Sequence, residues 1–409
     1  MRRLGPILLI AAAATLPAAA SAKPLRGAMN GAMSQAGGYS GAYVVNLTDG
    51  RVAYSLRAGR PRILASNTKL FTTSAALARF GAEGTLGTEV LGAGELTDEG
   101  VWRGDLYLRG GGDPTFGSRR FARRTYGGGA TVGQLADALE AAGILRVTGR
   151  VYGDESRFDS LRGGPDSGYA VSSYVGPLSA LAYNRGLASE VGFSFQSNPP
   201  RFAAARLDAA LARRDIPVRG GPRAGRAPDA ARVLASVDSP PMESIVRLTN
   251  KPSDNFFAEM LVKDLAMQRY GRGTTIRGAR LAAAFARRLG GRARLVDGSG
   301  LSRGDRASPY RVVRLLRAIQ RREEYDAFYR SLSIAGRDGT LRDRMRRGPA
   351  RGRCRGKTGT LWNVSALSGY CRARSGDVYA FSFLMNGVYP YGARKLQDRM
   401  VQAIAARRG

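Results

Sequence analysis

The chain has 409 residues, 44% of them hydrophobic, which predicts two domains or one domain with a large insertion. It contains no histidine, and this excludes Ser-His-Asp and Cys-His catalysis and histidine metal ligands. Its two cysteines, Cys354 and Cys371, are too few for a cysteine-rich zinc site. Lysine and arginine number 64 against 32 acidic residues, so the formal net charge is +32.

A charge of this size is typical of nucleic-acid-binding proteins, but the N-terminus argues against that partner. Arg2 and Arg3 precede an apolar run over residues 7–16, and the small residues at 20–22 fit a cleavage site. We expect residues 1–22 to be a signal peptide and the protein to be exported, to the periplasm. No nucleic acid is then expected, and the basic surface makes at most weak contact with anionic envelope surfaces. An uncleaved anchor is the alternative, although the run is short for a membrane span.

The composition and the hydrophobic pattern of the sequence change twice along the chain. Residues 40–58 alternate around a Thr-Asp-Gly turn and predict a β-hairpin, and helical spacing follows from Ser66. Residues 92–236 are rich in glycine and predict an inserted module, with strands over 105–108 and 149–153 and helices over 132–142 and 202–214. The later part predicts helices over 256–267, 275–289, 309–321 and 393–406, and strands over 357–362, 364–371 and 378–387. We expect the last, basic helix to pack on a sheet rather than on a membrane.

Ser66 and Lys69 stand at the start of the first predicted helix. Residues three apart share one face of a helix, so the hydroxyl and the amine are expected to meet. Only six of the 64 basic residues are lysine, and lysine can release its proton near neutral pH where arginine cannot. The pair alone is weak support, because the spacing also arises by chance and a solvated lysine would explain it.

Two further motifs follow in the chain. Ser253-Asp254-Asn255 precedes a predicted helix, and Lys357-Thr358-Gly359-Thr360 lies on a predicted strand. With Ser66-x-x-Lys69 before them, they form the signature of penicillin-binding proteins and class A β-lactamases. Chance occurrence of all three, in this order and context, would be rare.

The residue types of these motifs suit acyl transfer. A serine hydroxyl needs a base, and without histidine the Lys69 amine can serve if burial and a second cation, Lys357, lower its pKa. Backbone N–H groups of Ser66 and Thr360 are expected to form an oxyanion hole. Ser253 is expected to relay a proton between the lysine and the leaving nitrogen.

The remaining motif residues are expected to bind substrate. The Asn255 amide would hold a backbone amide of the substrate. Lys357 and the hydroxyls of Thr358 and Thr360 would hold a terminal carboxylate. Gly359 would let the substrate lie against the strand edge as an added strand.

The chain resembles the serine-type D-Ala-D-Ala carboxypeptidase/endopeptidase family, the class C low-molecular-mass penicillin-binding proteins. Phrases beyond the three motifs carry the resemblance across nearly the whole mature chain: GGGDPT (110–115), GDESRF (153–158), LSALAYNRG (178–186), LVDGSGLSR (295–303) and SIAGRDGTLRDRM (333–345).

The resemblance implies an α/β (α+β) fold. A transpeptidase/β-lactamase-like domain, with an antiparallel sheet flanked by helices, would comprise residues 23–91 and 237–409 and be interrupted by a smaller domain over 92–236. The implied function is a serine DD-peptidase, inhibited by β-lactams, that hydrolyses D-Ala-D-Ala bonds or peptide cross-links of peptidoglycan through an acyl-enzyme on Ser66. Peptidoglycan stem peptides are the implied partners. No metal ion and no organic cofactor is implied.

Some members of that family recognise the end of a diamino-acid side chain in the stem peptide. The resemblance implies that Arg303 contacts its carboxylate and that an acidic residue of the insertion takes its amine. Asp154 is the best match for the acidic residue, and Asp159 is a weaker one. The alternatives are that Arg303 is an ordinary surface arginine and that the aspartate is an ordinary turn residue. Trp362 departs from the family, which commonly has a smaller or polar residue there. A small β module that many relatives carry near residue 200 is absent or reduced.

Cys354 and Cys371 flank the strand that carries Lys357-Thr358-Gly359-Thr360. If the centre of a hairpin lies near residues 362–363, the two cysteines fall opposite each other. In an exported protein this favours a cross-strand disulfide. Two buried thiols are the alternative.

Two other functions stay open. A β-lactamase needs an efficient deacylation base, which is a glutamate in class A enzymes, and the sequence places no glutamate for that role. A non-catalytic wall-binding protein would have a decayed site, but all three motifs are intact. A penicillin-sensitive DD-peptidase is therefore the leading prediction.

Overall fold

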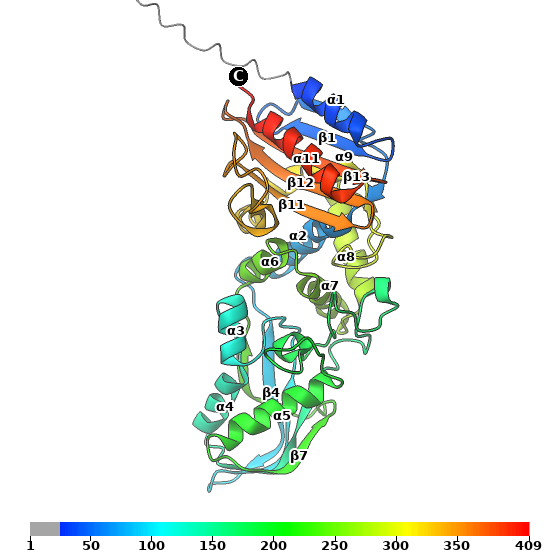
Figure 1. The fold of residues 1–409 in the computed structure, drawn as a ribbon. Coiled ribbons are helices and arrows are strands. Elements are labelled where there is room, and N and C mark those ends of the chain that lie inside the picture. The colour runs from blue at the N-terminus through cyan, green and yellow to red at the C-terminus, as the bar shows by residue number, and fades with distance from the viewer. Residues whose placement is uncertain (1–24, 409) are drawn as a thin grey trace, which may run out of the picture.

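The computed structural model describes residues 25–408, and it has two parts stacked end to end (Figure 1). The part at the top of the figure contains both ends of the described chain, and the lower part is formed by middle residues, coloured cyan to green. The predicted signal peptide, residues 1–22, lies outside the described residues. Over residues 25–408 no helix combines the length and apolar character needed to cross a membrane.

A six-stranded antiparallel sheet organises the upper part. Its strands, in spatial order, are β10 (Ser333–Ile334), β11 (Cys354–Leu361), β12 (Val364–Arg372), β13 (Val378–Asn386), β1 (Gly41–Asn46) and β2 (Val52–Leu56). The N-terminal strand β1 pairs along its whole length with β13, near the C-terminus. Both ends of the chain are therefore needed to build this sheet.

Helices lie on both sides of this sheet (Figure 1). One face carries α1 (Leu25–Gln35) and α11 (Pro390–Ala405). The helical layer on the other side consists of α2 (Thr68–Phe80), α6 (Met242–Asn250), α7 (Asn255–Tyr270), α8 (Thr275–Arg288), α9 (Pro309–Ile319) and α10 (Tyr325–Ser331).

The alternation of side chains along the strands fills both of these cores. On β13, Ala380 and Leu384 join the core that contains α2 and α7, whereas Phe381, Phe383 and Met385 join the core under α1 and α11. The last helix packs on the sheet, as the sequence predicted. The predicted α+β class, an antiparallel sheet flanked by helices, is confirmed.

The lower part has a mixed five-stranded sheet with a core of its own. Its strands, in spatial order, are β7 (Val218–Ala224), β6 (Arg146–Asp154), β5 (Val101–Arg109), β4 (Gly87–Leu96) and β8 (Arg232–Asp238). The pairs β5–β6 and β6–β7 are parallel, and the others are antiparallel. Helices α3 (Arg119–Tyr126), α4 (Val132–Ala141) and α5 (Pro199–Ala212) accompany it. The sheet begins and ends slightly outside the predicted insertion, 92–236, and the division into domains stays a prediction.

Short elements connect these layers. A two-stranded ladder joins β3 (Arg62–Ile63) to β9 (Arg306–Ala307). Single-turn 3₁₀ helices within residues 25–408 are η1 (Ala65–Asn67), η2 (Pro165–Ser167) and η4 (Gly339–Leu341). The segment η3 (Tyr183–Gly186) is a turn, because Asn184 and Arg185 have positive φ.

Side-chain caps decide where several predicted helices begin. Helix α9 starts where the Ser308 hydroxyl accepts the backbone N–H of Arg311, and α5 starts earlier than predicted because Asn198 caps it. Helix α7 starts at Asn255 because the Asp254 carboxylate accepts the N–H of Phe257 at 3.0 Å. The Ser253-Asp254-Asn255 motif is therefore a helix N-terminus.

Strands β11 and β12 form a hairpin with Trp362 and Asn363 at its tip. The register places Cys354 opposite Cys371, and the two form a disulfide at the open end of the hairpin. The structure thus contains the predicted cross-strand disulfide, on the strand that carries the third motif.

Removal of this disulfide should lower thermal stability. Its cysteines are 17 residues apart, and chain entropy for a loop of that size contributes about 3 kcal/mol. We expect the wild-type melting temperature, followed by circular dichroism, to fall on reduction. The C354A/C371A variant should melt lower than oxidised wild type and be insensitive to reductant. Thiol titration is used to show that reduction is complete. If the melting temperature of the fully reduced protein is unchanged, this prediction is contradicted.

Candidate active site

The three motifs meet at one cleft, although they lie far apart in the chain. Ser66 lies in η1 just before α2, Ser253 lies just before α7, and the third motif lies on β11. The cleft has a volume of about 1030 Å³. The predicted residues among its lining are Ser66, Ser253, Asn255, Thr358, Gly359 and Thr360.

Lys69 is fully buried beneath this cleft. Its Nζ lies 3.0 Å from Ser66 Oγ, 2.7 Å from Asn255 Oδ1 and 2.7 Å from the Ser299 carbonyl oxygen. Burial lowers the pKa of Lys69 to about 8, although buried carboxylates, Asp297 foremost, act in the opposite direction. An amine with this pKa has a substantial neutral fraction near physiological pH, and it touches the serine hydroxyl.

Lys357 is the second buried lysine of the site. Its Nζ donates to Ser253 Oγ at 2.8 Å and to the carbonyl oxygen of Thr358 at 2.9 Å. Burial, and then the charge of nearby Lys69, hold the pKa of Lys357 well below its usual range. Each motif serine therefore contacts one buried lysine.

Ser253 is held in an unusual conformation at the entrance to α7. Its φ of 64° lies in the left-handed region, which a serine adopts only when its surroundings impose it. The next residue, Asp254, forms an ion pair with Arg185 of the η3 turn. The Arg185 guanidinium lies over the ring of Phe256, 5.1 Å from its centre.

Arg185 is a residue that our sequence reasoning did not assign to the site. It belongs to the middle part of the chain, and it clamps the Ser253-Asp254-Asn255 motif through Asp254. The only available signal was its place in the phrase LSALAYNRG, because its partner lies 69 residues away.

Gly359 lines the cleft, and its lack of a side chain also matters for packing inside the protein. A Cβ built on it would lie 2.9 Å from the Leu64 carbonyl oxygen and 3.0 Å from the backbone nitrogen of Ser66. The missing side chain therefore lets β11 pack against the turn that carries Ser66. The Asn67 side chain also donates to the carbonyl oxygen of Lys357, at 3.0 Å. The close approach at Gly359 is between two segments of the protein.

Buried carboxylates hold the loop that supplies the Ser299 carbonyl. One oxygen of Glu259 accepts the N–H groups of Gly298 and Ser299, at 3.1 and 2.9 Å. Asp297 accepts two further N–H groups of the loop, both at 2.7 Å. Burial and the charge of Asp297 raise the pKa of Glu259 to about 8. Glu259 lies one helical turn after Asn255, and this spacing was the signal that could have identified it.

Arg303, at the end of this loop, reaches the tip of the β11–β12 hairpin. Its guanidinium donates to the Trp362 carbonyl oxygen at 3.1 Å and to Asn363 Oδ1 at 2.9 Å. Trp362 lines the rim of the cleft and is 83% exposed. Arg303 is therefore next to the cleft, although it is not itself part of the lining.

Asp154 does not reach the cleft, and its predicted role is wrong for this geometric reason. It is buried at the end of β6, where its carboxylate accepts the N–H groups of Ser156 and Ala227, at 2.8 and 3.0 Å. The weaker match, Asp159, pairs with Lys263. The acidic residue of the middle part that does line the cleft is Asp166, in η2.

These contacts define a class of site, in which a serine hydroxyl is paired with a buried lysine beside a strand that lines the cleft. The profile of the D-Ala-D-Ala carboxypeptidase 3 (S13) family matches residues 28–190 and 185–407. The chain therefore belongs to that family, and the predicted family and enzyme class, a serine-type D-Ala-D-Ala carboxypeptidase, are confirmed.

Individual relatives agree with this assignment. The chain is 29% identical to a D-alanyl-D-alanine carboxypeptidase of Actinomadura sp. (strain R39), over 90% of this chain and 81% of the relative. It is 31% identical to carboxypeptidase DacB of Mycolicibacterium smegmatis, over 80% of this chain and 72% of the relative. Its fold is similar to that of penicillin binding protein 4 (dacB) from Haemophilus influenzae, with a TM-score of 0.76 and 19% identity over 91% of this chain and 97% of the other.

Substitution of Gly359 tests the packing of β11 against the serine turn. In Gly359→Ala the new methyl would press on the backbone at Leu64 and Ser66, and we expect acylation of Ser66 by a fluorescent penicillin to slow at least about tenfold, because small misplacements of reacting groups are costly. Gly221→Ala is the control, since a Cβ there meets nothing within 4 Å. An unchanged acylation rate in folded Gly359→Ala would contradict the packing role.

Proposed function

We propose that the protein is a penicillin-sensitive DD-peptidase in which Ser66 is the nucleophile and Lys69 its general base. The observation that carries this proposal is the position of Lys69 Nζ, 3.0 Å from Ser66 Oγ and fully buried. A neutral amine has two N–H groups and one lone pair. The N–H groups donate to Asn255 Oδ1 and to the Ser299 carbonyl, each at 2.7 Å. The lone pair is then left for the Ser66 hydroxyl proton.

The reaction that follows is acyl transfer in two steps. Ser66 Oγ attacks the carbonyl carbon of the scissile peptide bond as its proton passes to Lys69, and the negative oxygen is stabilised by the N–H groups of Ser66 and Thr360. Ser253 relays a proton to the leaving nitrogen, the C–N bond breaks, and an ester on Ser66 remains. Water then hydrolyses this ester and restores the free serine.

The terminal carboxylate of the substrate binds at the β11 end of the cleft. Buried Lys357 and the hydroxyls of Thr358 and Thr360 are the proposed ligands. The Thr358 hydroxyl is 2.8 Å from that of Thr340, and the Thr360 hydroxyl accepts from Arg394 at 3.1 Å, so both are already oriented. A β-lactam carboxylate would use the same ligands, which accounts for inhibition.

The third residue of the stem peptide is recognised at the other end of the cleft. We assign its side-chain carboxylate to Arg303 and its amine to Asp166, which replaces Asp154 in this role. The support is that Asp166 lines the cleft, while Arg303 is fixed beside the rim by the hairpin tip. The proposed substrate is therefore peptidoglycan, a polymer that lies outside the cytoplasm. The proposed location of the enzyme is the periplasm.

The β-lactamase alternative has less support. Within residues 25–408 the carboxylates that line the cleft are those of Asp166, Asp343 and Asp398, and no glutamate is among them. Asp398 is paired with Arg344 at 2.7 Å. An efficient deacylation base of the class A type is therefore not available in the lining.

Labelling with a fluorescent penicillin tests the proposed function. The purified protein should form a stable adduct, and mass spectrometry of the labelled peptide should find it on Ser66. Ser66→Ala, checked for folding, should not label. Rapid turnover of the drug without an adduct would favour a β-lactamase, and absence of both label and turnover in folded wild type would favour a wall-binding protein.

The pH dependence of acylation tests Lys69 as the base. Because the pKa of Lys69 is about 8, the neutral fraction, and with it the acylation rate, should rise nearly tenfold per pH unit below that value and level off above it. Lys69→Arg, which stays charged, should not acylate at any pH. A flat rate between about pH 6 and about pH 9 would contradict the assignment.

A further inference from the structure

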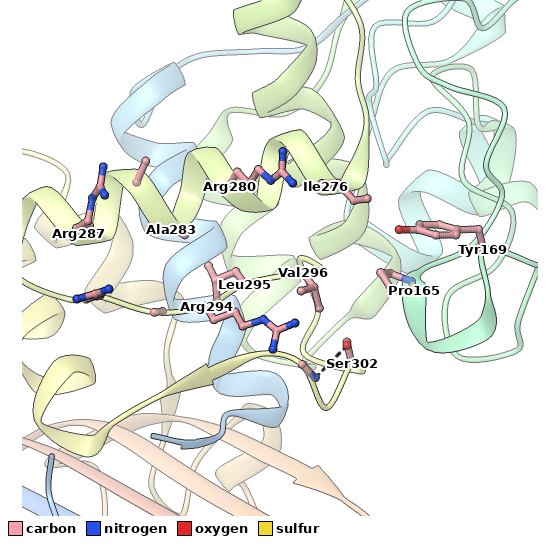
Figure 2. Close-up of a pocket in the computed structure, with 14 residues that line it drawn as sticks. Pro165, Tyr169, Ile276, Arg280, Ala283, Arg287, Arg294, Leu295, Val296 and Ser302 are labelled. Atoms are coloured by element: carbon pink, nitrogen blue, oxygen red, sulfur yellow. Dashed lines mark hydrogen bonds between the residues drawn. The ribbon is translucent and has the colours of Figure 1, made fainter. Parts of the chain in front are cut away.

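A second groove lies beside the active-site cleft, along helix α8 (Figure 2). Its volume is about 780 Å³. Ala283 and Ala284 of α8 form one wall, and Leu295 and Val296 form the other. At one end the groove reaches Pro165 and Ser302, whose chain neighbours are Asp166 and Arg303. The groove therefore begins where the proposed recognition of the third residue ends.

The charges around this groove have one sign. Four exposed arginines line it: Arg280, Arg287, Arg292 and Arg294. No acidic residue is part of the lining, and within residues 25–408 none of the four has an ion pair or a side-chain hydrogen bond. Figure 2 shows Arg280 and Arg287 on α8 and the Arg294 side chain extending from the opposite segment toward Ser302.

Four unpaired guanidinium groups around one groove repel one another, and an anion placed among them relieves that repulsion. Guanidinium groups bind carboxylates through paired N–H···O bonds. The apolar walls between the arginines would accept the aliphatic part of such a ligand. The lining therefore suits a peptide that carries carboxylates.

We propose that this arginine groove is a subsite for acidic groups of the peptidoglycan stem peptide on the acyl-donor side of the scissile bond. This inference rests on the proposed function, because the substrate must lie along β11. With its terminal carboxylate at Lys357, the donor part of the peptide runs toward Trp362 and Arg303. Beyond that point, Ser302 and Pro165 lead into the groove. The enzyme thereby prefers donors with free carboxylates over amidated ones.

The test compares two synthetic donor peptides that end in D-Ala-D-Ala. They have the same length and shape, and both keep the side-chain carboxylate of the third residue, which is assigned to Arg303. They differ only in that the carboxylates upstream of that residue in one are carboxamides in the other. We expect wild type to hydrolyse the carboxylate peptide with a kcat/KM roughly fivefold to tenfold higher, the size expected for two exposed ion pairs. The difference should lie in KM rather than kcat, because this binding is remote from the reacting atoms.

Arg280→Gln/Arg294→Gln should lose most of this preference. The matched control is Arg219→Gln/Arg223→Gln, which removes two exposed arginines from β7, far from the cleft, and should keep it. Equal kcat/KM values for the two peptides in wild type would overturn the proposal. A preference that survives in the groove variant, or is lost equally in the control variant, would overturn it too.

Two further measurements distinguish this proposal from the proposed function on which it rests and from a groove that binds phosphate groups. Penicillin labelling of wild-type Ser66 reports on the proposed function alone, so failure of that function is distinguishable from failure of the groove. Binding to inorganic polyphosphate and to vesicles of anionic lipid is measured for both double variants. Loss of these interactions in the groove variant, with the peptide preference intact, would assign the groove to phosphate groups and overturn the peptide proposal.

Discussion

A buried lysine amine is the contact on which the site depends. Lys69 leaves water entirely, and an amine in such a place needs hydrogen-bond partners and a lowered pKa. Its three partners come from η1, from the first turn of α7 and from the loop before β9. The same atoms that make Lys69 a candidate base therefore hold three distant segments together. Packing and chemistry share one group here, and displacement of any of these segments would disturb both.

An ion pair ties the middle part of the chain to the Ser253-Asp254-Asn255 motif. Arg185, in η3, holds Asp254 while Asp254 caps α7, and this fixes the strained backbone at Ser253. Ser253 in turn meets Lys357 on β11. A link therefore runs from the five-stranded part of the molecule to β11, the strand that carries the third motif. Together with Asp166, it makes the middle part a contributor to the site as well as an extension of the fold.

Charge is distributed unevenly in this basic protein. The formal net charge is +32, yet the loop behind Lys69 is built around buried carboxylates, with Glu259 and Asp297 accepting four backbone N–H groups. Burial raises the pKa of Glu259 and of Asp305, so these carboxyls serve the loop mainly as hydrogen-bonding groups. Arg280 and Arg287, on the exposed side of α8, line the groove next to the cleft.

The sequence by itself determined the family and the candidate chemistry of the site. The absence of histidine left lysine as the candidate base, the order of three short motifs indicated the family, and the spacing of Cys354 and Cys371 predicted their pairing. Local patterns sufficed because each motif sits at a helix start or on a strand, where capping and alternation are legible in a few residues. Tertiary structure decided which distant side chains reach the cleft. Asp154 and Asp166 are both acidic residues of the same region. The path of the chain after β6 decides that Asp154 is buried and that Asp166 lines the cleft. Arg185, Glu259 and the role of Gly359 likewise depend on partners far away in the sequence, and a contact of that kind leaves no periodic signal in the chain.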